Sequence, residues 1–154
     1  GKAPNHPVQS VDWYDSVKWC NARSEWAGKA PVYYYHFNRA APVPAGTKLA
    51  NFANRDDLEN LGAFHTADVP YVFGTLDVRK WNWNSTDRNL SKIMQGYWLA
   101  FARGGRPRAA GAPDWPAFDA KEPRVMLLGD RIGLAPVPHR DAYDFFDRVN
   151  RYQP

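Results

Sequence analysis

The chain has 154 residues, of which 44% are hydrophobic and 23% charged, the proportions of a folded domain with a core of its own. Acids and bases are interleaved and the net charge is only +4, with no basic stripe, so we expect no nucleic-acid partner. No apolar run approaches the length of a membrane span, so we expect no membrane partner, and a single cysteine, Cys20, excludes an internal disulfide.

The first predicted element is a helix over residues 9–28. Ser10 or Asp12 can cap its start and Gly28 ends it. Cys20 falls on the apolar face of this helix, where a free cysteine usually packs as a small hydrophobe.

A strand is predicted next, over Val32–Phe37, because this run is almost entirely β-branched and aromatic. Its continuous rather than alternating bulk indicates that both faces are covered. Residues 38–62 contain prolines, Gly46 and the polar run NRDDLEN, and we interpret them as a long loop with one short helical turn.

The strongest helix runs from Thr86 to Arg103. Thr86 is the expected N-cap, Asp87 is favourable in the first turn, and the two glycines after Arg103 end the helix. Its apolar residues follow helical spacing: Leu90, Ile93, Met94, Tyr97, Trp98 and Phe101.

Two further elements close the chain. The sequence RVMLLGD predicts a second core strand over Val125–Leu128, which the Thr86–Arg103 helix should cover. PHRDAYDFFDRVNRY predicts a final helix whose inward residues are Ala142, Phe145, Phe146 and Val149. The order α-β-loop-α-β-α fits part of a layered α/β fold, which we expect to form one domain over residues 1–154.

From about Gly28 to Phe146 the chain resembles the C-terminal part of type B carboxylesterases, the family of bacterial para-nitrobenzyl esterases and cholinesterases. The segments that carry the likeness occur in the family's order: GKAPVYYYHFNRAAP, GAFHTADVPYVFGTLD, LSKIMQGYWLAFARGGRP, WPAFD and VMLLGDRIGLAPVPHRDAYDFFD. The resemblance implies an α/β-hydrolase-type sheet with covering helices and an ester substrate. It also implies that the histidine of the GAxHxx[DE]xPYVF motif, here His65, belongs to a catalytic triad.

The beginning of the chain has a different likeness. Asn5–Glu25 resembles a segment of the formylglycine-generating, sulfatase-modifying family, whose reactive cysteines lie outside this segment, so Cys20 inherits no catalytic role. Two origins stay open: an esterase with a divergent first helix, or a chimera of the two families, with residues 28–146 from the esterase.

These residues do not contain all the groups that an esterase needs. The chain has five serines, and none has glycine both two residues before and two after, as the G-x-S-x-G elbow requires. A Gly-rich oxyanion loop is also missing. We therefore expect the serine, the acid and the oxyanion hole to lie outside the chain, and no efficient turnover by the chain alone.

Several carboxylates lie near His65 in the sequence. Asp68 could act on it electrostatically, although a local cap or a surface salt bridge is the ordinary role of such a residue. Asp56, Asp57 and Glu59 could orient the histidine, but a solvated loop face is their ordinary role.

The remaining candidates point away from cofactors. His6, His36 and His139 lack metal-ligand spacing and there is no second cysteine, so we expect neither a metal nor a cofactor. An aromatic group could line an acyl or carbohydrate pocket, with core packing as its default role: Tyr33, Tyr34, Tyr35, Trp81 and Trp83.

Two functional hypotheses follow. In the first, the chain is the part of a serine carboxylic-ester hydrolase that supplies His65. In the second, it is a non-catalytic structural or binding module. Either way, a sheet with open edges predicts self-association or a complementing chain.

Overall fold

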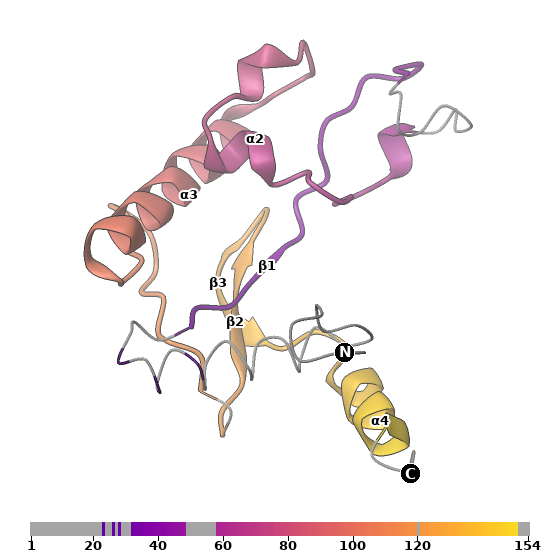
Figure 1. Ribbon diagram of the computed structural model, residues 1–154. Helices are drawn as coiled ribbons and strands as arrows, with labels where there is room; N and C mark the ends of the chain where they lie inside the picture. Colours follow the sequence, from indigo (N-terminus) through magenta and orange to yellow (C-terminus); the bar gives the residue numbers. More distant parts are fainter. Residues whose placement is uncertain are drawn as a thin grey trace, which may run out of the picture. The chain divides into compact units, whose positions relative to one another are not determined.

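The structure is a computed structural model that describes Arg23, Trp26, Gly28 and residues 32–48, 58–119 and 121–150 (Figure 1). The contacts group the chain into two units, residues 33–135 and residues 1–32 with 136–154. Most of the helix expected over residues 9–28, Cys20 included, lies outside the described residues. That the chain forms one domain stays a prediction.

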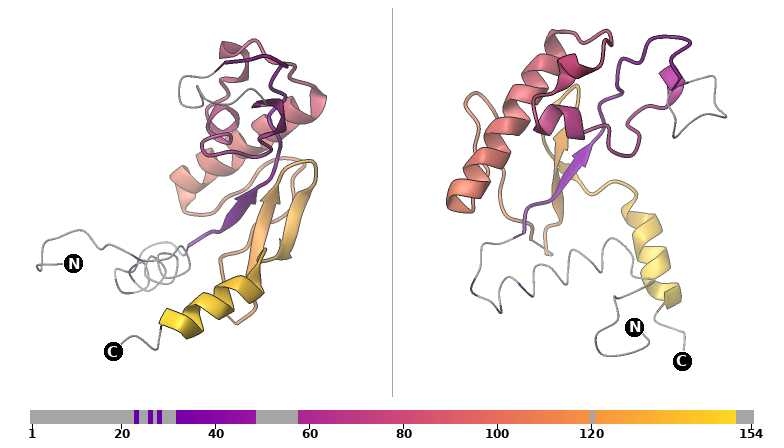
Figure 2. Two further views of the ribbon diagram at one scale, coloured as in Figure 1. Left: turned by 90° about the vertical axis from the view of Figure 1, so that its right-hand side faces the viewer. Right: turned by 45° about the horizontal axis from the view of Figure 1, so that its top comes forward.

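The first unit is built on a three-stranded sheet of β1 (Tyr35–Phe37), β2 (Arg124–Leu128) and β3 (Ile132–Pro136), in that spatial order. β1 runs parallel to β2, with Tyr35 opposite Met126. β2 and β3 follow each other across a short turn and lie side by side as a hairpin, which makes the sheet mixed (Figure 2). Both expected strands are therefore present, and β3 is an addition.

β1 is shorter than the predicted Val32–Phe37 strand. Its parallel ladder extends from the Tyr34 carbonyl, which accepts from the Met126 amide, to the Asn38 amide, which donates to the Leu128 carbonyl. The side chains of the whole predicted strand are half-buried rather than covered on both faces. The size of these side chains therefore led to too high an expected burial. β1 is an edge strand among the described strands, so its side chains have a neighbouring strand on one side only.

The long helix α3 (Ser85–Gly104) begins one residue after its true N-cap, Asn84, and the prediction of Thr86 is wrong. The backbone of Asn84 is extended, and its side-chain oxygen accepts from the amides of Thr86 (2.9 Å) and Asp87 (3.2 Å). The Asp87 carboxylate accepts in return from the Asn84 amide (2.9 Å), which completes a capping box. Gly105, in the left-handed region at φ 69°, ends the helix as expected.

α3 covers one face of the sheet, and the core lies between them (Figure 2). Leu90, Met94 and Tyr97 of its predicted apolar face are buried against Met126 and Leu128 of β2. Burying each large side chain contributes about 1.5–3 kcal/mol. Further along the same face the cover thins, because Trp98 is half-buried and Phe101 is exposed.

Short helical segments connect these elements. They are η2 (Leu58–Asn60), α2 (Val69–Val72) and η3 (Leu76–Val78), and α2 packs against α3 (Figure 1). The expected loop with one helical turn is confirmed over its described part, residues 38–48 and 58–62.

The final helix, α4 (Arg140–Asn150), is present as predicted. Its expected inward face is wrong, because Phe145, Phe146 and Val149 are between 47% and 56% exposed, and Ala142 is exposed as well. Helical periodicity reveals an apolar face but not whether a surface is available to cover it. None of the described helices is long and apolar enough to cross a membrane.

Candidate active site

His65 lies at the exposed tip of a turn that is anchored on both sides. Before it, Phe64 packs against a small cluster formed by Ala41 and Val43. After it, Ala67 is buried and its amide donates to the Phe64 carbonyl at 2.9 Å. The flanking residues therefore fix the backbone while the imidazole remains on the surface.

The residue after the histidine adopts an unusual backbone conformation. Thr66 has φ 68°, in the left-handed region that β-branched residues rarely enter. Its carbonyl accepts from the Val69 amide at 3.2 Å, and the Asp68 carbonyl accepts from Tyr71 and Val72. Strain of this kind persists where the surrounding structure determines the conformation, and here the turn is held by its backbone hydrogen bonds and by the packing of Phe64.

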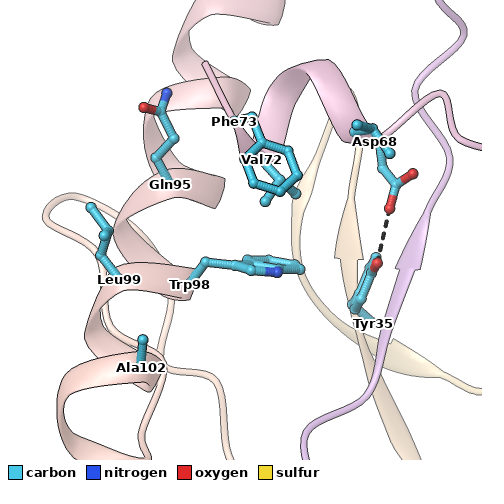
Figure 3. A pocket seen from close by; sticks show the side chains of 9 residues that line it. Tyr35, Asp68, Val72, Phe73, Gln95, Trp98, Leu99 and Ala102 are labelled. Carbon is cyan, nitrogen blue, oxygen red and sulfur yellow. Dashed lines mark hydrogen bonds between the residues drawn. The ribbon is translucent and has the colours of Figure 1, made fainter. Parts of the chain in front are cut away.

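Among the contacts within the described ranges, the Asp68 side chain makes neither a capping bond nor a surface salt bridge, the two ordinary roles expected for it. It is the N-cap residue of α2 but makes no capping bond with its side chain. Its carboxylate accepts a hydrogen bond from the hydroxyl of Tyr35 in β1 at 2.9 Å, as Figure 3 shows. Burial, followed by this bond and the charge of Asp68, raises the pKa of Tyr35 above its usual range. Asp68 thus ties the start of α2 to the sheet.

A cavity of about 550 Å³ opens beside this hydrogen bond, between α2 and α3 (Figure 3). Trp98 reaches from α3 toward Tyr35, and Phe73 and Leu99 are among the other residues that line the cavity. Of the aromatic group expected to line either a pocket or the core, Tyr35 alone lines this cavity. Among the others, Tyr33 and Trp83 pack against the main core, Trp81 packs against the cluster under Phe64, and Tyr34 contacts Phe118.

A second cluster of polar side chains is centred on Asp87 and includes Tyr71 of the His65 motif. The Asp87 side chain has no exposed surface, and its Oδ1 accepts from Arg39 Nε (2.7 Å) and from the Tyr71 hydroxyl (2.8 Å). Arg39 also pairs with Asp130, which lies between β2 and β3. Three segments thus meet at one buried carboxylate, namely the end of β1, α2 and the start of α3, and Arg39 links this group to the β2–β3 turn.

The charges of this group are set by their contacts. Burial alone would raise the pKa of Asp87, but hydrogen bonds from Arg39, the Asn84 amide and Tyr71 outweigh it and lower that pKa, so the carboxylate stays ionised. The bond to Asp87 raises the pKa of Arg39, and burial raises that of Tyr71. The sequence identified Asp87 only as a first-turn acid, because its partners are 16 and 48 residues away.

Two of the five serines lie in the described residues. Ser85 is exposed at the start of α3. Ser91 is buried and donates its hydroxyl to the Tyr71 carbonyl at 2.8 Å, which is a structural bond. The other three, Ser10, Ser16 and Ser24, lie outside the described residues.

The other sequence candidates are dispersed. Glu59 is exposed in η2, while Asp56, Asp57 and His6 lie outside the described residues. His36 is half-buried in β1, and His139 is exposed just before α4. Within the described ranges, no three side chains of His, Cys, Asp or Glu gather in a way that could hold a metal ion.

A family model described as "Carboxylesterase family" matches residues 12–146. The chain belongs to the carboxylesterase family. It is 27% identical over 133 residues to the para-nitrobenzyl esterase of Bacillus subtilis (strain 168), covering 84% of this chain and 24% of that protein. It is 32% identical over 114 residues to the cocaine esterase of Homo sapiens, covering 73% of this chain and 19% of that protein.

Solved structures agree with the sequence relatives. A para-nitrobenzyl esterase aligns over 87% of this carboxylesterase-family chain with a TM-score of 0.59 and 25% identity. A thermophilic para-nitrobenzyl esterase aligns over 86% with a TM-score of 0.61 and 26% identity. The fold is therefore of the α/β-hydrolase type. In both cases the match spans 24% of the solved chain, so this chain covers about a quarter of the length of these relatives.

The family match also bears on the beginning of the chain. It starts at residue 12 and so includes most of Asn5–Glu25. These findings give no support to the predicted resemblance of that segment to the sulfatase-modifying family, or to a chimeric origin.

Proposed function

We propose that the chain supplies the general base, His65, of a serine carboxylic-ester hydrolase whose serine, acid and oxyanion hole are contributed by sequence outside these 154 residues. The observation that carries the proposal is the position of His65. It occupies the histidine place of the GAxHxx[DE]xPYVF motif and lies within the family match, on an exposed turn whose backbone is fixed on both sides.

The contacts of the chain's own residues support the assignment of the base to this chain and of the nucleophile to other sequence. A triad histidine must reach a serine hydroxyl with one ring nitrogen and a carboxylate with the other, so it must be accessible before those partners arrive. The His65 side chain is exposed. Ser91 is committed to the Tyr71 carbonyl and Asp68 to Tyr35, so neither is free to complete a triad.

The reaction then follows the general course of acyl transfer. His65 takes the proton of the serine hydroxyl as its oxygen attacks the ester carbonyl, and gives that proton to the departing alcohol. Water, activated by the same histidine, releases the acid from the acyl-enzyme. The developing negative charge on the carbonyl oxygen needs backbone amide donors from outside the chain.

A hybrid enzyme tests the proposal. Residues 12–146 would replace the matching segment of the Bacillus subtilis para-nitrobenzyl esterase, which covers 24% of that protein. We expect the hybrid to hydrolyse a para-nitrophenyl ester, and His65→Ala to lower kcat by at least about 10³-fold, because the serine then has no base.

His36→Ala and His139→Ala are matched controls, since they remove an imidazole elsewhere in the chain. Thermal unfolding of each variant separates loss of chemistry from loss of fold. A folded His65→Ala hybrid that keeps most of its activity would refute the proposal.

The alternative is a non-catalytic structural or binding module. It is favoured by exposed apolar side chains, because Phe73 is 71% and Val78 80% exposed, as binding surfaces often are. This alternative predicts that His65→Ala leaves the kcat of the hybrid esterase unchanged.

A further inference from the structure

We propose that Asp87 is a positioning residue for His65: its buried carboxylate holds α2, and through α2 the histidine turn, against the sheet and α3. The inference rests on the proposed function, because positioning matters to catalysis only if His65 is the base.

The first step is the contact between Asp87 and α2. The Tyr71 hydroxyl donates to Asp87 Oδ1 at 2.8 Å, and the Tyr71 ring is completely buried. The Tyr71 carbonyl accepts from Ser91, one helical turn further along α3. Tyr71 is therefore held by α3 at both its side chain and its backbone, which leaves α2 little freedom to rotate or slide.

The second step is the link from Tyr71 back to His65. The five residues between them form consecutive turns, in which the amides of Ala67, Val69 and Tyr71 donate to the carbonyls of Phe64, Thr66 and Asp68, respectively. Because each of these bonds joins residues only three positions apart, a displacement of Tyr71 must also displace the turn. The left-handed Thr66 makes the turn dependent on this support, since its conformation is unfavourable without it.

The third step is the anchor on the other side of Asp87. Arg39 follows β1 and donates to Asp87 at 2.7 Å, and Asn84 donates its amide to the second carboxylate oxygen at 2.9 Å. The carboxylate is thus fixed to the sheet and to the helix end before it receives Tyr71. A carboxylate with all its partners in place holds its neighbours in one arrangement, as a well-satisfied buried network does.

Amide hydrogen exchange in the 154-residue chain tests the positioning directly. The reporters are the amides of Ala67, Val69 and Tyr71, and the reference is the Met126 amide, which donates from β2 to the Tyr34 carbonyl. We expect Asp87→Asn to speed exchange at the reporters at least about 10-fold more than at Met126. A merely structural role would speed all four together.

Two further variants keep the test decisive. Tyr71→Phe removes only the hydroxyl and should give the same local pattern at smaller amplitude, so it decides the matter if Asp87→Asn does not fold. Asp77→Asn is the matched control: it removes a carboxylate that pairs with Arg88 at 2.9 Å on the surface, and should leave the reporters unchanged. If Tyr71→Phe speeds exchange at the reporters no more than it speeds exchange at Met126, relative to the wild type, the proposal is overturned.

The hybrid esterase adds a catalytic readout. There Tyr71→Phe should lower kcat by on the order of 10-fold while KM changes less than about twofold, because the base is misplaced but the substrate site is intact. If His65→Ala is inactive and Tyr71→Phe has full kcat, the positioning role is wrong although the proposed function stands. If His65→Ala is fully active, the proposed function has failed, and the exchange data report on the segment alone.

Discussion

At the scale of single residues, the decisive feature is the ionised carboxylate of Asp87, which has no access to solvent. A buried carboxylate is unfavourable unless donors replace the lost water. Asp87 has three donors, namely Arg39 Nε, the Tyr71 hydroxyl and the Asn84 amide. Every buried side-chain nitrogen or oxygen in the described residues likewise has a hydrogen-bond partner, so the polar interior of this part of the chain is satisfied.

Asp87 should therefore control stability against acid. Its pKa is lower in the folded state than the usual value near 4, so its contribution is present above about pH 4 and is lost as the pH falls through the folded-state pKa. Asp87→Asn should cost about 3 kcal/mol at pH 7, because it removes the buried partner of Arg39 and leaves that guanidinium only its pair with the exposed Asp130. Urea unfolding at a series of pH values measures this. A difference between wild type and variant that does not shrink below pH 4 would contradict it.

The sequence singles out His65 as a candidate, but predicts for Asp87 only a place in the first turn of a helix, for a physical reason. His65 lies in a local motif that can be recognised from neighbouring residues. Asp87 depends on Arg39 and Tyr71, which only the chain topology brings to it. Asp68 illustrates the same limit, because its partner Tyr35 is 33 residues away and the sequence suggested only local roles.

At the scale of elements, α3 packs closely enough to restrict its own composition. A Cβ added to Gly96 would lie 2.8 Å from the Cβ and 3.3 Å from the Cα of Ala109. The loop after α3 therefore packs closely against Gly96, and no larger residue fits at this position. At Gly104, in the last turn of the same helix, an added Cβ would meet nothing within 4 Å.

These two glycines give a matched test. Helix propensity alone predicts that alanine at either position stabilises the protein by up to about 1 kcal/mol. We expect Gly104→Ala to be neutral or slightly stabilising, and Gly96→Ala to be destabilising by about 1–2 kcal/mol net, because the backbone of Ala109 cannot yield easily. Equal midpoints for the two variants in chemical denaturation would show that the helix and this loop do not pack as described.

Element types were predictable where the pattern was long. The helix over residues 86–103 and the strand over 125–128 are both present, since their periodicity and apolar content leave little choice. The N-cap moved from Thr86 to Asn84 because the reciprocal bond with Asp87 selects the residue three positions before it. β3 was missed because Gly133 and Pro136 are both unfavourable in strands.

At the scale of the whole molecule, apolar surface remains open. Phe73, Val78 and Leu99 are each more than half exposed, and Phe73 is the last residue of the GAxHxx[DE]xPYVF motif that contains His65. We expect the isolated chain to self-associate at micromolar concentration, or to bind a complementing chain, because exposed apolar surface of this kind favours association.

Static light scattering on two variants checks this expectation. Phe73→Gln should lower the average mass, whereas Asn82→Gln, a change at an exposed polar residue, should not. A wild-type chain that remains monomeric across micromolar concentrations would rule out self-association.

In the proposed function, this chain contributes the base and not the nucleophile. A fluorophosphonate probe measures it most directly, because the probe reacts only with an activated serine. We expect no label on the 154-residue chain alone. In the hybrid esterase we expect a label on a serine outside residues 12–146, lost in His65→Ala and kept in His36→Ala. A label mapped by mass spectrometry to Ser85, Ser91 or any other serine of this chain would show that the chain supplies the nucleophile.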